Sequence, residues 1–184
     1  MMNARNLQRG FNLVELMMVM GMMGLLGLAI FFSLQAGDVQ MKTAELKMNL
    51  QDSAREGLYK MAQELRESSP STSPVRIQIG DPASSVVFKV PHPTNPLKTD
   101  YSIDWDNAQT IQYALGGLSN HQIIRTNQST GTTTVLANDV VQLSFVLSGR
   151  NMTISIGVQK SLSNGRVVPA SPLVLTTEFE VRND

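Results

Sequence analysis

The spacing of apolar residues changes twice along this chain, from an unbroken run to a stripe and then to alternation. The run from Leu16 to Leu34 is almost entirely apolar, and no charge lies between Glu15 and Asp38. About 20 apolar residues in a helix, at ~1.5 Å each, cross a hydrocarbon core of ~30 Å. The sequence therefore predicts a transmembrane helical segment over residues 11–37.

After this run the pattern stays helical but becomes one-sided. Apolar residues recur three or four positions apart, with charged residues between them, at Leu46, Leu50, Ala54, Leu58, Met61 and Leu65. Ser68-Ser69-Pro70 ends the pattern, because proline cannot continue a helix and disfavours helical geometry at the residue before it. We expect residues 38–69 to form an amphipathic half of the same helix, with an apolar stripe that needs a cover.

From Val75 onward the apolar period falls to two, which is typical of strands. Strands are predicted at 75–79, 86–90, 111–115, 122–126, 140–147, 152–158 and 173–181, and several neighbours are expected to pair as antiparallel hairpins. A sheet with one apolar face would cover the helical stripe. The predicted fold class is α+β, in which a long N-terminal helix packs on an antiparallel β-sheet domain over residues 70–184.

One carboxylate, Glu15, interrupts the beginning of the apolar run. An ionisable group inside a membrane span costs roughly 2.5–3.5 kcal/mol on insertion scales, which indicates a specific partner. Glu15 follows Phe11 by four residues, and positions four apart share one face of a helix. A chain cut before Phe11 would gain an amino terminus able to be that partner.

The segment Arg9-Gly10-Phe11, with Glu15 after it, resembles the start of type IV prepilins and of type II secretion pseudopilins. These proteins share a short basic leader, a Gly, a Phe, and a Glu four residues after the Phe. The resemblance implies that a prepilin peptidase removes a leader of residues 1–10 by cutting between Gly10 and Phe11. It also implies N-methylation of Phe11 and a role for Glu15 in subunit assembly.

The C-terminal half is similar to the larger, W-like minor pilins and to J-like pseudopilins. This similarity rests on three segments, Ile111-Gln-Tyr-Ala-Leu115, Ile124-Arg125 and Leu136-Ala-Asn-Asp-Val-Val-Gln-Leu-Ser-Phe145. The implied partners are other pilins or pseudopilins, the prepilin peptidase and the inner membrane. Unlike many major pilins, this chain has no Cys for a C-terminal disulfide loop.

The flanking charges predict the orientation in the membrane. Arg5 and Arg9 precede the span, so by the positive-inside rule the N-terminus is cytoplasmic and the remainder is exported. We expect a single-pass protein of a bacterial inner membrane, which joins a periplasmic or cell-surface filament after assembly. A secretory signal peptide is disfavoured, since its apolar core is only ~7–15 residues and a small residue is wanted where Leu34 stands. A plain signal anchor would leave Glu15 unexplained.

Composition excludes several other functions. The 184 residues provide one span and one domain of ordinary size. Loss of Arg5 and Arg9 from the 15 Lys and Arg leaves 13 against 15 Asp and Glu, so the chain has no electrostatic footprint for nucleic acid. Without Cys, neither disulfides nor thiolate metal sites can form.

We expect neither enzymatic activity nor a cofactor. The chain has no Gly-x-Ser-x-Gly, no His-Glu-x-x-His and no glycine-rich phosphate loop. His92 and His121 stand alone in the sequence, and we interpret both as residues of surface loops, because a His base normally needs a second positioned group.

One oxygen-rich segment is a weaker candidate for calcium, which some pseudopilins bind. Its side chains are Asp100, Asp104, Asp106 and Asn107. Their spacing matches no EF-hand, so we expect no metal site and interpret the segment as a solvated turn around Trp105.

The sequence as a whole predicts a minor pilin or pseudopilin, a structural and assembly subunit of a type IV pilus or type II secretion-like filament. The pattern is shared by pilus, secretion and DNA-uptake systems. The alternative is a membrane-anchored monomeric binding protein, an adhesin or sensor with a β-rich exported domain. Cleavage of the chain after Gly10 distinguishes the filament subunit from the anchored monomeric protein. A secreted hydrolase is a third class, but no residue of the sequence indicates a substrate for it.

Overall fold

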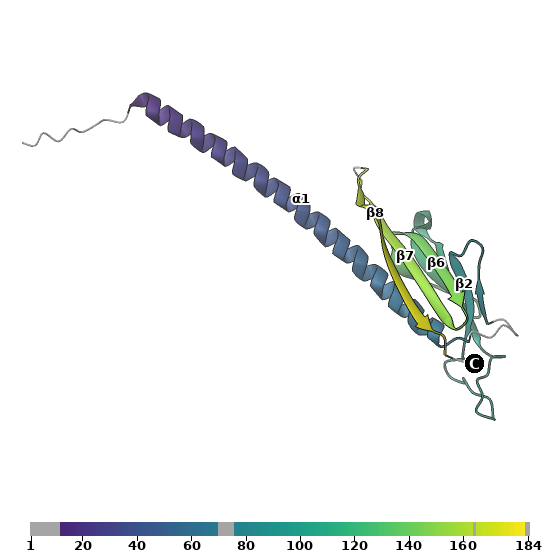
Figure 1. The fold of residues 1–184 in the computed structure, drawn as a ribbon. Helices are drawn as coiled ribbons and strands as arrows, with labels where there is room; N and C mark the ends of the chain where they lie inside the picture. Colours follow the sequence, from purple (N-terminus) through teal and green to yellow (C-terminus); the bar gives the residue numbers. More distant parts are fainter. Residues whose placement is uncertain (1–11, 70–75, 164, 183–184) are drawn as a thin grey trace, which may run out of the picture. The chain divides into compact units, whose positions relative to one another are not determined.

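The structure is a computed structural model that describes residues 12–69, 76–163 and 165–182. The leader 1–10, the predicted cleavage site Gly10–Phe11, Pro70 and Val75 lie outside the described residues. The chain divides between Ala44 and Glu45 into two compact units, each of which we treat separately. One helix, α1 (Leu13–Arg66), contributes to both units (Figure 1).

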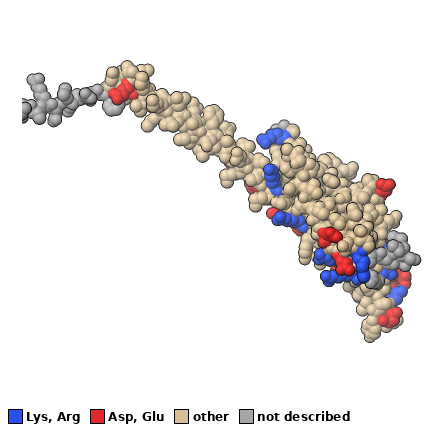
Figure 2. Space-filling view, in the orientation of Figure 1, with Lys and Arg blue, Asp and Glu red and all other residues tan. Residues whose placement is uncertain are grey.

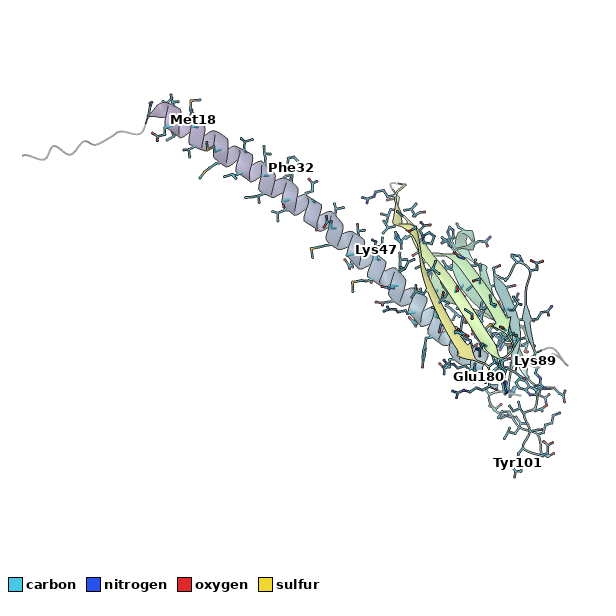
Figure 3. All side chains as sticks on the ribbon, in the orientation of Figure 1. Met18, Phe32, Lys47, Lys89, Tyr101 and Glu180 are labelled. Atoms are coloured by element: carbon cyan, nitrogen blue, oxygen red, sulfur yellow. The ribbon has the colours of Figure 1, made fainter. Side chains whose placement is uncertain are left out.

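The first unit consists, in its described part, of α1 up to Ala44. This segment is long and apolar enough to cross a membrane, and none of its most apolar stretch is buried within the chain. In Figure 3 the labelled Met18 and Phe32 side chains point outward from the helix. A single apolar helix near the N-terminus is compatible with a membrane anchor.

The second unit begins with the remainder of α1, which packs against antiparallel strands. The buried helical residues are Leu50, Ala54, Gly57, Leu58, Met61, Ala62 and Leu65. Leu46 is partly buried against the same core. The predicted stripe is therefore confirmed, and its cover is the β-structure, as expected for the α+β class.

The last hydrogen bonds of the helix are of the 3-10 type, between residues three positions apart. Glu67 N–H donates to Glu64 O at 3.1 Å, and Ser68 N–H donates to Leu65 O at 3.2 Å. These i→i+3 bonds satisfy backbone carbonyls that have no partner further along the chain. Ser68 and Ser69 are buried, so the chain turns into the unit directly after the helix.

Five strands form one antiparallel sheet in chain order. They are β1 (Ile77–Ile79), β2 (Ser85–Val90), β3 (Gln109–Gly116), β4 (Gln122–Asn127) and β5 (Thr132–Asn138), with a short 3-10 helix η1 (Leu118–Asn120) between β3 and β4. Phe88 pairs with Ile111, which in turn pairs with Asn127. Val86, Phe88, Ile111, Tyr113 and Ile123 point into the core.

A second, three-stranded antiparallel sheet contains β6 (Val140–Ser148), β7 (Asn151–Ser161) and β8 (Val167–Glu180). Its inward side chains include Phe145, Ile154, Ile156 and Phe179. A backbone bond from Phe145 N–H to Ala83 O at 2.9 Å connects the two sheets. Both sheets and the helix share one apolar core.

Three details of the strand prediction are wrong. The β-structure is split into two sheets where one was expected. Strand β5 was not predicted, because its Thr132-Thr-Thr134 start has no apolar alternation. Strand β8 begins at Val167 and not at 173, although it contains Pro169 and Pro172. Because β8 is an edge strand, it tolerates prolines that would break a ladder in a central strand.

Candidate assembly site

The first part of α1 presents apolar side chains on every side. Leu16–Gly37 carries no charge, and Figure 2 shows this part of the helix almost entirely in tan. The exposed fraction is 65% for Met17, 70% for Leu25 and 62% for Phe32. A helix that is apolar all round is stable only in lipid or under a cover of other protein. This exposed apolar surface is compatible with a membrane anchor.

Glu15 lies in the first turn of this apolar helix. Its own N–H donates to Asn12 O at 2.9 Å, while the side chain is exposed. The positive end of the helix dipole favours a carboxylate at this position. Among the residues that the structure describes, none forms an ion pair with Glu15. Its carboxylate is thus exposed beside the positive end of the helix dipole.

Polar character returns abruptly where the apolar run ends. Lys42 Nζ lies 2.9 Å from Asp38 Oδ2, and both side chains are exposed. Such an i,i+4 pair contributes a few tenths of a kcal/mol, about 0.3–0.5, to a helix in water. The pair is typical of a helix face in water, and it marks the end of the uncharged surface of α1 near Asp38.

A three-residue polar cluster attaches α1 to the five-stranded sheet. Glu64 Oε2 accepts a hydrogen bond from the Tyr113 hydroxyl at 2.6 Å, and both Glu64 oxygens lie 3.0 Å from Arg125 Nε. Burial, followed by the bond to the Glu64 carboxylate, raises the pKa of Tyr113 above its ordinary value. We call this group the Glu64 cluster. It specifies the position of the helix on the sheet, because charge-assisted bonds are strong and directional.

A second contact, made by Arg66, connects the end of α1 to the three-stranded sheet. Its guanidinium lies over the Phe179 ring of β8, 5.4 Å from the ring centroid. Contacts of this kind contribute about 0.5–1 kcal/mol at exposed sites. The last turns of α1 are therefore attached to both sheets.

The oxygen-rich segment does not form a metal site in the described part of the chain. Each carboxylate serves the local fold: Asp100 accepts from Ser102, Asp104 accepts from Asn107, and Asp106 pairs with Lys98. No group of three or more metal-ligating His, Cys, Asp or Glu side chains occurs among the described residues.

The expectation of a solvated turn around Trp105 is wrong. Trp105 is only 8% exposed, and the Arg76 guanidinium lies 4.4 Å from its ring centroid. Asp104 is also buried. The indole is instead an anchor that holds this loop on the second unit.

The two histidines lie apart, as loop residues in the structure. The His92 ring is 3.0 Å from Thr94 Oγ1, an exposed local contact. His121 is exposed and lines a groove of about 410 Å³ together with Asp139, Val141 and Gln159.

Comparisons with protein-family models, with curated proteins and with solved structures find no match to this chain. The functional argument therefore depends on the residues and on their geometry. Of the predicted site residues, Gly10 and Phe11 lie outside the described part, and Glu15 is placed in the first turn of α1. The Glu64 cluster is the polar contact that the sequence analysis missed, because its members are separated by 49 and 61 positions.

Proposed function

We propose that this chain is a minor pilin or pseudopilin, an assembly subunit of a type IV pilus or type II secretion-like filament. In this proposal it enters the inner membrane with its N-terminus in the cytoplasm. Prepilin peptidase removes residues 1–10, Phe11 is methylated, and the mature subunit joins a filament or its initiating complex through α1. Its partners are other pilins or pseudopilins, and it performs no catalysis.

The observation that carries the proposal is the division of α1 into two halves with different surroundings. No described residue covers the first half, while the second half is part of the core of the globular unit. A helix built in this way serves as a membrane anchor and as an element of the fold. On leaving lipid, its first half requires other apolar helices around it.

Glu15 favours a filament subunit over a monomeric anchored protein. A monomer gains nothing from a carboxylate in its span, since an unpaired charge in hydrocarbon is costly or becomes protonated. In an assembly, the new amine of Phe11 on a neighbouring subunit would lie at a similar depth. A close ion pair with further hydrogen bonds persists where an isolated charge does not.

The decisive test is the mass of the N-terminal peptide of the chain purified from a host with an active prepilin peptidase. We expect a mature chain that begins at Phe11 with a methylated amine. Gly10→Val should block cleavage, because a bulky residue replaces the Gly at the cut, whereas Gly24→Val should be processed normally. Retention of Met1 in the wild-type chain would contradict the proposal and favour the monomeric anchored protein.

A further inference from the structure

Methionine is concentrated in the first unit, near the beginning of α1. Five of the 11 Met residues of the chain lie close together there: Met17, Met18, Met20, Met22 and Met23. All five side chains are exposed, with exposed fractions between 63% and 70%, and Met18 is labelled in Figure 3. From Leu25 to Leu34 the bulky positions are filled by Leu, Ile and Phe instead. Sulfur is therefore gathered at one place in the apolar half of α1.

Three of these residues follow one another along one side of the helix. Met17, Met20 and Met23 are spaced by three, and residues three apart on an α-helix have Cβ atoms about 5–6 Å apart. The unbranched Met side chain has three rotatable bonds, so the two outer thioethers can turn toward the central one. Met18 and Met22, four positions apart, lie on a different side. We call Met17, Met20 and Met23 the thioether row.

The space beside the thioether row is open in the described part of the chain. Gly21 and Gly24 lie four positions after Met17 and Met20, on the same side of the helix. A Cβ added at either glycine would contact no side chain within 4 Å. The thioethers of the row therefore have room to converge on one small ligand without displacing a packed group.

Apolar bulk alone does not account for methionine at these positions. Leu has about the same helix propensity as Met, and fixing a Met side chain costs roughly 1.5–2 kcal/mol of rotamer entropy against about 0.5–1 for Leu. What Met provides and Leu lacks is a soft, polarisable sulfur. Thioether ligands select Cu(I), whereas Mg²⁺ and Ca²⁺ take oxygen ligands. Because the chain contains no Cys, its thioethers are its only sulfur ligands.

We propose that the thioether row is a binding site for a soft monovalent cation, Cu(I). The ion keeps its oxidation state, and the neutral thioethers release no proton when they bind it. The row begins at the second residue of the uncharged run from Leu16, so the ion lies near one end of that run. A charge there costs less than at the centre of an apolar span.

This inference goes beyond the proposed function. It requires neither cleavage after Gly10 nor a neighbouring subunit, so the two proposals fail separately. A measurement on the purified full chain in detergent is sufficient to test it.

The first experiment measures Ag(I) binding by titration calorimetry in a buffer without chloride. Ag(I) shares the soft character of Cu(I) and does not need protection from air. We expect one Ag(I) per chain, with the same affinity at about pH 5 as at about pH 7, because a thioether has no proton to lose in this range. A site built from His92 or His121 would instead weaken toward about pH 5, where imidazole is protonated.

The second experiment compares two triple variants. Met→Leu at all three positions of the thioether row keeps the apolar surface and should lower the affinity more than about tenfold, because no sulfur remains on that side. The matched control removes three thioethers from other positions of α1, by Met18→Leu, Met22→Leu and Met41→Leu, and should bind as the wild type does. Both variants should unfold at the denaturant concentration of the wild type, since none of the six side chains is buried.

Cu(I) itself, kept reduced by ascorbate and measured by competition with a coloured Cu(I) chelator, should rank the three proteins in the same order. The proposal would be overturned by the absence of Ag(I) binding to the wild type or by an affinity that falls toward about pH 5. Equal affinities of the row variant and the control variant, for either ion, would overturn it as well.

Discussion

The two halves of α1 are made of similar apolar residues and differ in what covers those residues. In the first half, side chains such as Leu25 are exposed on all sides of the helix. In the second half, Leu50, Met61 and Leu65 lie on one face that the sheets bury, while charged residues occupy the opposite face. The same residue type therefore stabilises the globular unit in one half, whereas in the other half it has no cover among the described residues.

Each half also carries a glutamate that follows the same contrast: one has partners within the chain, and the other is exposed. Glu64 is satisfied within the chain, by Tyr113 and Arg125. Glu15 has no ion-pair partner among the described residues. The polar and apolar groups of the second half are thus satisfied within the chain, whereas those of the first half have neither ion-pair partner nor cover among the described residues.

The largest effect on the stability of the second unit should come from its buried stripe. Leu65→Ala should lower the free energy of unfolding by about 2–5 kcal/mol, because it removes buried methyl groups and leaves a cavity. Leu25→Ala, on the apolar half, should leave this free energy unchanged. Trp105, the single Trp of the chain, reports unfolding by fluorescence during denaturant titration in detergent. Equal destabilisation by both variants would contradict the contrast between the halves.

The helical half of the fold was predictable because its signals are local. A period of three to four residues specifies the stripe, and the predicted members of that stripe are buried or partly buried in the structure. The change of period after Val75 likewise predicted most strands. The polar edge strand β5 and the proline-containing start of β8 were not predictable in this way, because edge strands need neither apolar alternation nor every ladder bond.

The candidate site was predictable only in part, for a related reason. Glu15 stands out in the sequence because a charge among apolar residues is a local anomaly. The Glu64 cluster joins residues that are distant along the chain, and Glu64 itself resembles any other charge on the polar face of an amphipathic helix. The burial of Trp105 under Arg76 also depends on a contact between distant segments.

The next largest effect should come from the Glu64 cluster. Glu64→Gln replaces one carboxylate oxygen by an NH2 group and removes the negative charge. The hydrogen bond from the Tyr113 hydroxyl or the one from Arg125 is therefore weakened. We expect a loss of about 1–3 kcal/mol in the free energy of unfolding. The control is Glu56→Gln, which breaks an exposed i,i+4 pair with Lys60 and should cause no measurable change. If the two variants unfold at the same denaturant concentration, the cluster does not hold the helix on the sheet.

A smaller, pH-dependent effect follows from the same cluster. Burial and the bond to Glu64 raise the pKa of Tyr113 above its ordinary value of 10.0, so the folded state favours the protonated phenol. This contribution to stability is complete below pH 10 and is lost as the pH rises further. The wild type should therefore lose stability relative to Tyr113→Phe as the pH rises above about 10, and not below it. Parallel pH profiles of the two proteins would exclude the contribution.

The smallest effect on the fold is expected at Glu15, where the effect on assembly should be clear. Glu15→Gln removes the charge but keeps the size of the side chain, and it lies in the first unit, whose described residues form no buried core. The free energy of unfolding followed by Trp105, membrane insertion and cleavage at Gly10 should all equal those of the wild type. Insertion should be unaffected because a neutral amide costs less than a carboxylate in hydrocarbon.

Incorporation should fall nonetheless, because the amide cannot form the ion pair proposed with the Phe11 amine of a neighbour. The measurement is the fraction of the chain that co-purifies with other pilins or pseudopilins at native expression. Glu15→Asp is the informative companion, since it keeps the charge but shortens the reach, and it should incorporate better than Glu15→Gln. Wild-type incorporation of Glu15→Gln would show that assembly does not use the charge. The first half of α1 would then require from outside only an apolar cover, which lipid alone can provide.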